Sequence, residues 1–137
     1  MSIVQTQTTS FKAELYQAVH DLTTDTLKIA LYTGNADLNA DTTQYTTSNE
    51  VSGTGYVAGG VVLTGVTINT SGYTAYVNFN NAQFNASVTA RCALIYNASK
   101  SNKSIAVLDF GSDKTSANFT VTMPTNTATS ALIRSSN

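Results

Sequence analysis

The sequence predicts a mainly β protein, an antiparallel β-sandwich or jelly roll with one N-terminal α-helix. Three observations lead to this fold class. About eight segments have the alternating or β-branched composition of strands, and turn residues separate them roughly every 8–14 residues. One segment near the N-terminus repeats its apolar residues at helical spacing. Strands and helices do not alternate along the rest of the chain, which excludes a doubly wound parallel sheet.

The N-terminal part of the chain is expected to divide into an arm and a helix. Residues 1–10 are polar and rich in Thr and Gln, so we expect an arm, extended or loosely ordered, that can add a strand to a neighbouring sheet. Residues 11–137 are expected to form a single β-sandwich domain. At its start, five apolar residues share one helical face: Phe11, Leu15, Ala18, Val19 and Leu22. This spacing predicts a helix over residues 11–22, with Ser10 as its N-cap.

The strands are predicted from their composition and from the turn residues between them. They are expected at residues 26–33, 56–69, 73–80, 82–84, 87–97, 104–110, 118–124 and 130–134. Gly59 and Gly60 predict a bulge or bend in the second of these strands. Because the 87–97 strand is apolar on both faces, we expect it at the centre of a sheet. Strict alternation gives the 73–80 strand one apolar face of Tyr73, Ala75, Val77 and Phe79.

Three connections between the strands are distinctive. Residues 34–56 form a long polar loop, and loops of this length are usually functional or ordered by a neighbour. Residues 97–103 are expected to be a hairpin tip that carries two lysines, and residues 111–118 are expected to be another turn.

The 137-residue chain is poor in charge. Charged residues make up 11% of it and the net charge is -1, whereas about 25% of residues are charged in a typical protein. Hydroxyl and amide side chains replace them, with 23 Thr, 14 Ser and 13 Asn. This composition argues against nucleic-acid binding, which needs a basic surface. No apolar run approaches the roughly 20 residues of a membrane span, and no secretory signal is present, so we expect a soluble protein made in a cytoplasm.

Groups that could carry catalysis or bind a cofactor are few. His20, the only histidine, is expected to be a solvent-exposed or lightly buried residue of the helix, and Cys92, the only cysteine, is expected to be a small core residue. Asp37 and Asp41 copy the opening of a calcium loop, but the later positions of that motif are not matched. The sequence therefore predicts no enzyme, no catalytic residues, no cofactor and no metal site.

The order of several sequence blocks is more specific than the composition. The chain contains an F-K-x-E-L helix, a K-I-A-L-Y-T strand, a T-x-Y-T-x-x-N-E-V-x-G-x-G-Y block, an A-L-I-Y-N strand and then D-F-G. Over residues 11–134 this order resembles small structural proteins of tailed bacteriophages. It is most similar to the cement or decoration proteins that lock capsomers together on the outside of the shell. The resemblance implies a jelly-roll sandwich that assembles as a dimer or trimer, and it implies no catalytic residues.

The first hypothesis is therefore a virion protein on the capsid exterior, a cement or decoration subunit that bridges copies of the major capsid protein and forms a homo-oligomer. Tyrosine is enriched at interfaces, and two tyrosines flank the long loop. We expect contacts in the arm, in this loop and in the lysine-bearing hairpin, at Ile3, Val4, Tyr45, Glu50, Tyr56, Lys100 and Lys103.

Two alternatives remain open. The second hypothesis is a tail or fibre component, with a receptor- or glycan-binding platform built from tyrosines and polar loops such as residues 35–47. The third is an enzyme such as a small hydrolase, which would require Asp37, Asp41 and Glu50 to gather around a metal.

Overall fold

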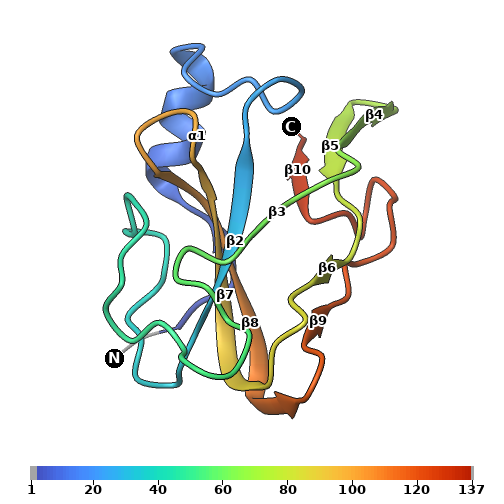
Figure 1. Cartoon of the computed structure of the whole chain (residues 1–137). Coiled ribbons are helices and arrows are strands. Elements are labelled where there is room, and N and C mark those ends of the chain that lie inside the picture. Colours follow the sequence, from blue (N-terminus) through green and yellow to red (C-terminus); the bar gives the residue numbers. More distant parts are fainter. Residues whose placement is uncertain (1–2, 137) are drawn as a thin grey trace.

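The computed structural model describes residues 3–136, and it confirms a mainly β chain with antiparallel sheets and one α-helix (Figure 1). The N-terminal part contains β1 (Thr6–Gln7), α1 (Thr9–Tyr16) and β2 (Leu27–Tyr32). The middle part contains β3 (Val61–Val62), β4 (Thr67–Ser71), β5 (Thr74–Asn78) and β6 (Ala82–Gln83). The C-terminal part contains β7 (Val88–Asn97), β8 (Lys103–Ser116), β9 (Thr120–Val121) and β10 (Ile133–Ser135).

These strands form three sheets in the described part of the chain. The largest has five strands in the order β1-β8-β7-β2-β3, the second has three in the order β10-β5-β4, and the third pairs β6 with β9. In Figure 1 the two smaller sheets lie on one side of β2 and β7, and α1 and the long loop lie on the other. The layers are consistent with a β-sandwich, and the finer assignment to a jelly roll stays a prediction.

Both faces of the five-stranded sheet are buried, so residues 3–136 form two cores. Leu27, Ile29 and Leu31 on β2 face the core between the sheets, which also contains Phe79, Phe84 and Phe119. Ala30 and Tyr32 face a second core beneath the long loop, made with Ala36, Leu38, Cys92, Leu94, Tyr96 and Val107. The prediction of a central 87–97 strand is confirmed, because β7 lies between β8 and β2.

The helix covers Thr9–Tyr16 rather than residues 11–22. Its N-cap is Thr8, not Ser10, and the Thr8 hydroxyl accepts a hydrogen bond from the Phe11 N–H at 3.3 Å. The five apolar residues at helical spacing therefore do not form one packed face. Phe11 is fully buried, whereas Leu15 is 37% exposed.

The helix ends early because the backbone turns left-handed at Ala18, where φ is 58°. The Ala18 N–H then donates to the Leu15 carbonyl at 3.2 Å, and the Val19 N–H donates to the Glu14 carbonyl at 3.0 Å. This pair of bonds is a Schellman closure, which usually requires Gly rather than Ala at the left-handed position. The turn directs the following residues back to the core, so Leu22 is buried outside any helix.

The predicted 56–69 strand is interrupted. Only Val61–Val62 pairs with β2, and β4 begins at Thr67. The predicted bend at the double glycine is confirmed, with φ of 98° at Gly59 and 81° at Gly60. A side chain on Gly60 would place its Cβ 1.8 Å from the Ile29 carbonyl oxygen, so only glycine fits against β2 here.

Two other expectations are wrong. Residues 111–118 are not a turn, because β8 continues to Ser116 and pairs again with the first residues of β7. Gly111, with φ of 83°, and the register shift opposite Arg91 make this an irregular strand. The 73–80 segment also lacks a continuous buried face, because Tyr73 is 94% exposed at the tip of the β4–β5 hairpin.

The N-terminal segment lies against its own domain rather than projecting from it. Thr6 and Gln7 pair with β8, and the Val4 N–H donates to the Leu38 carbonyl at 3.0 Å. Thr8 is fully buried. Of the expected arm over residues 1–10, the first two residues lie outside the described part of the chain.

Candidate functional site

One carboxylate, that of Glu50, joins two tyrosines of the long loop to the turn that follows it. The Tyr45 hydroxyl donates to Glu50 Oε1 and the Tyr56 hydroxyl to Glu50 Oε2, both at 2.6 Å. The Gly59 N–H donates to Oε2 at 2.8 Å. The Tyr45 ring also stacks on Tyr96, with centroids 4.7 Å apart. Three of the predicted interface residues therefore meet one another, and their polar ends point into the protein.

The phenols around Glu50 are held in their neutral form. Burial, and then the hydrogen bond to the Glu50 carboxylate, raises the pKa of Tyr45 and of Tyr56. Burial, and then the charge of Glu50, raises the pKa of Tyr96 to about 12. These hydroxyls therefore remain donors across the neutral pH range, as an internal clasp requires.

The lysine-bearing hairpin between β7 and β8 is also tied inward. Lys100 Nζ donates to both oxygens of Asp25, at 3.0 and 2.9 Å, and Asn97 Nδ2 donates to Asp25 Oδ2 at 2.7 Å. Burial alone would raise the pKa of Asp25, but the bonds from Lys100 and Asn97 outweigh it and the pKa falls to about 2. Lys103 Nζ lies 3.8 Å from Glu14 Oε2.

His20 is buried and lies outside the helix, which corrects the expectation of a solvent-exposed or lightly buried residue of the helix. It lies beyond the end of α1, and its side chain has no exposed surface. Its Nε2 is 2.9 Å from Glu14 Oε1, and its Nδ1 is 2.9 Å from Asn97 Nδ2. Since the Asn97 amide nitrogen can only donate, Nδ1 accepts and Nε2 carries the proton that is donated to Glu14. His20 therefore joins α1 to the hairpin.

Ile3 and Val4 differ from each other. Ile3 is half-buried against the core beneath the long loop and bridges to Leu38. Val4 is 48% exposed, which leaves its side chain accessible to a partner.

The segment that resembles a calcium loop forms a turn centred on Asn39. Asn39 Nδ2 donates to Asp37 Oδ1 at 3.0 Å, and Asn39 Oδ1 accepts from the Asp41 N–H at 2.9 Å. Glu50 is committed to the tyrosines. Among residues 3–136 no group of three or more His, Cys, Asp or Glu side chains is placed to hold a metal ion.

Cys92 is a free, buried thiol on β7, as a small core residue would be. Burial, and then the charge of Asp109, raises its pKa to about 12. The thiol is therefore protonated at neutral pH and is a poor nucleophile.

A feature that sequence reasoning missed lies in the middle of the chain. Residues 51–90, called here the uncharged segment, contain no Asp, Glu, Lys, Arg or His. More than half of its residues are exposed, among them Val57, Val62 and Ile68. Its strands β4, β5 and β6 lie on the opposite side of β2 and β7 from the long loop (Figure 1). The interval without charge between Glu50 and Arg91 is the signal that could have identified it.

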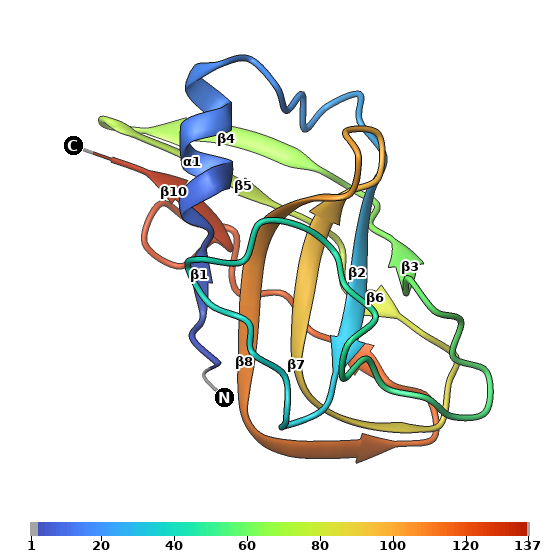
Figure 2. The same ribbon diagram turned by 90° about the vertical axis from the view of Figure 1, so that its left-hand side faces the viewer.

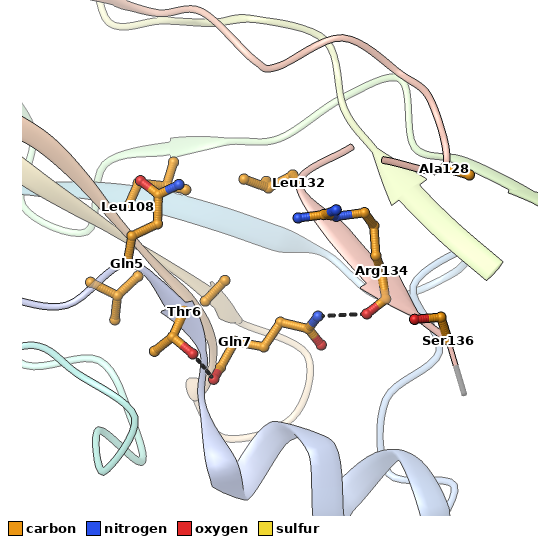
Figure 3. Close-up of a pocket in the computed structure, with 10 residues that line it drawn as sticks. Gln5, Thr6, Gln7, Leu108, Ala128, Leu132, Arg134 and Ser136 are labelled. Carbon is orange, nitrogen blue, oxygen red and sulfur yellow. Dashed lines mark hydrogen bonds between the residues drawn. The ribbon is translucent and has the colours of Figure 1, made fainter. Parts of the chain in front are cut away.

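A polar groove lies between β1 and β10 and has a volume of about 310 Å³. Gln5, Gln7 and Arg134 project into the space between the two strands (Figure 3). Gln7 Nε2 donates to the Arg134 carbonyl at 2.9 Å, and Gln5 Oε1 accepts from the Asp109 N–H at 3.0 Å. Arg134 Nη1 also donates to the Thr129 carbonyl, so each of the three side chains has one partner within the chain and keeps further donors or acceptors for a ligand.

Comparison with known proteins adds no family assignment. No family model, no curated protein and no solved structure matches this chain. Within residues 3–136, the helix is too short and too polar to cross a membrane.

Proposed function

We propose that the protein is a virion structural protein, a cement or decoration subunit on the outer surface of a tailed-phage capsid. It would bind the major capsid protein and stabilise the shell by bridging neighbouring capsid subunits. The sequence blocks over residues 11–134 support the phage assignment. The uncharged segment is the single structural observation that carries the proposal.

An exposed surface of hydroxyl, amide and small apolar groups suits a protein that is present in many copies. Hydrogen bonds made by Thr, Ser and Asn depend little on salt, directly or through water. A net charge of -1 allows copies to crowd together without strong repulsion. Each contact can be modest, because bridging two subunits makes the second contact intramolecular. Since the protein would bind the assembled shell only, its binding stabilises that shell.

The internal bonds of the predicted interface residues change the role we propose for them. Tyr45, Glu50 and Tyr56 shape the long loop, and Lys100 fixes the hairpin, so their effect on a partner is indirect. Val4 and the exposed residues of the uncharged segment are free to make the contacts themselves.

The amount of protein in purified virions tests this function. We expect an amount comparable to that of the major capsid protein on a stained gel. Particles that lack the protein should lose DNA at a lower temperature than complete particles. A chain that is far scarcer than the capsid protein, or knockout particles with unchanged heat tolerance, would contradict the cement role.

The groove between β1 and β10 favours a second candidate, a tail or fibre component that binds a glycan. Amides and arginine are common hydrogen-bonding partners of sugar hydroxyls, and the groove supplies Gln5, Gln7 and Arg134. Titration of host surface glycans, followed by NMR shifts, distinguishes this candidate. Saturable shifts at these three residues support it, and unchanged spectra exclude it.

A further inference from the structure

The strand β4 is a free edge of the three-stranded sheet. The sheet order is β10-β5-β4, so β4 has a partner on one side only, and all five of its residues are exposed. The β4–β5 pairing is regular from Thr67 opposite Asn78 to Ser71 opposite Thr74. Gly72, with φ of 58°, occupies the first position of the two-residue turn.

This register determines which backbone groups of β4 face outward. In a two-residue hairpin the closing pair, Ser71 and Thr74, exchanges hydrogen bonds, and the hydrogen-bonded pairs then alternate. Asn69 and Thr67 therefore also face β5. The N–H and C=O groups of Ile68 and Thr70 point away from the sheet, where a further strand would bind.

The edge has no charge, proline or bulge that would protect it against pairing. A side chain contacts it at its first residue, where Asn126 Nδ2 donates to the Thr67 hydroxyl at 3.1 Å. Natural edge strands carry charges, prolines or bulges, or are covered by other elements. The sequence of β4 is Thr-Ile-Asn-Thr-Ser, within the uncharged segment, and its pairing with β5 has no register shift. The opposite edge of the same sheet, β10, carries Arg134. In Figure 2, β4 extends along the outer margin of the molecule behind α1.

The side chains of β4 are compatible with a second copy of the same strand. In an antiparallel pair centred on Asn69, Thr67 is opposite Ser71 and Ile68 is opposite Thr70. Threonine pairs with a hydroxyl neighbour favourably across strands, and no like charges meet. The outward backbone groups also match, because Ile68 and Thr70 of one copy face Thr70 and Ile68 of the other.

Ile68 gives the pairing an apolar contribution. It lies on the same sheet face as Val77 and is 49% exposed. Together with Leu15 it lines an apolar groove of about 480 Å³ between α1 and the three-stranded sheet. A strand added at β4 would cover part of this exposed surface.

We propose that β4 pairs with β4 of a second copy of this chain, antiparallel and across a two-fold axis at Asn69. The two three-stranded sheets then join into one continuous sheet through both copies. This dimer goes beyond the capsid function and does not depend on it, since it requires only the isolated protein.

A cysteine substitution tests the axis directly. Asn69 faces itself in a non-hydrogen-bonded pair, where Cα atoms are about 4.5 Å apart, which lies within disulfide range. Cys92 is buried and the chain has no other cysteine. Asn69→Cys should therefore give mainly a disulfide-linked dimer on a non-reducing gel after mild oxidation. Ser112→Cys, at an exposed position of β8, is the matched control and should stay mainly monomeric.

The second test introduces opposite charges at position 69 in two separate variants. Because Asn69 is exposed, these substitutions should leave the fold intact. We expect the wild-type chain to sediment as a dimer at micromolar concentration. Asn69→Lys and Asn69→Glu should each be monomeric with an unchanged circular dichroism spectrum, and their equimolar mixture should restore the dimer. A wild-type monomer or trimer would overturn the proposal. So would a dimer that persists in both variants, or cross-linking of Asn69→Cys no greater than that of Ser112→Cys.

Discussion

The long loop at residues 34–56 and the β4–β5 hairpin are held in place differently. The loop is fastened by the Glu50 carboxylate, which accepts bonds from Tyr45, Tyr56 and Gly59. The hairpin has no charged residue and is held by regular backbone pairing. Several of this protein's few charges thus fix its own loops, and the uncharged segment is the part that we propose contacts other molecules.

The largest effect is expected at the glycine that connects the two regions. Gly60→Ala should destabilise the protein by about 4 kcal/mol or prevent folding, because the new Cβ meets the Ile29 carbonyl and φ is positive. Urea unfolding measures this change. Gly72→Ala is the matched control, since that site has open space around it and should lose only about 1 kcal/mol. Equal losses at both sites would contradict the close contact at Gly60.

The second-largest loss of stability is expected in the long loop. Glu50→Ala removes the acceptor of two tyrosine hydroxyls and one backbone N–H, and should cost about 3 kcal/mol in unfolding free energy. Asp41→Ala, in the same loop but exposed, should change stability by no more than about 0.5 kcal/mol. If the two variants unfold at the same urea concentration, Glu50 does not fasten the loop.

A smaller effect is expected from acid at the lysine-bearing hairpin. Against the effect of burial, the Lys100 and Asn97 bonds lower the pKa of Asp25 from its ordinary value of 3.8 to about 2 in the folded protein. A lowered folded pKa means that the stabilisation is present above pH 3.8 and is lost as the pH falls towards 2. Asp25→Asn should therefore reduce stability at pH 6 by about 1 kcal/mol, since solvent screens part of the pair. Its difference from the wild type should shrink as the pH falls from 4 to 2 and vanish below pH 2, and a difference independent of pH would refute this assignment.

The smallest effect on stability is expected within the uncharged segment. Val57 is 72% exposed, so Val57→Lys should change unfolding free energy by no more than about 0.5 kcal/mol. If the uncharged segment contacts the capsid, the same variant should bind stripped particles about tenfold more weakly. Asn35→Lys, an exposed substitution outside this segment, serves as the control. Equal binding by the two variants would show that the uncharged segment does not contact the capsid.

The sequence predicted the central strands better than their ends. β2 and β7 were evident because long β-branched and apolar runs are buried on both faces. The helix end was not predictable from spacing, because Leu15 and Val19 fit a helical face while a left-handed Ala18 redirects the chain. The continuation of β8 past Gly111 was missed because Gly, Ser and Asp are typical of turns and also occur in bulges.

In the candidate site, too, some features could be predicted from the sequence and others depend on the tertiary structure. Loop length and tyrosine content drew attention to residues 45–56 as an interface, which stays a prediction. Whether a tyrosine hydroxyl points to a partner or to Glu50 depends on tertiary packing. The burial of His20 likewise depends on the turn after α1 and on Asn97, which is far away in sequence. The uncharged segment, by contrast, is visible in the sequence alone.

The location of the chain on intact virions tests the central claim most directly, and a cryo-EM reconstruction measures it. The account predicts density for this fold at repeated positions on the outer capsid surface, with residues 51–90 turned towards neighbouring subunits. Density confined to the tail, or particles that contain none of this protein, would contradict it.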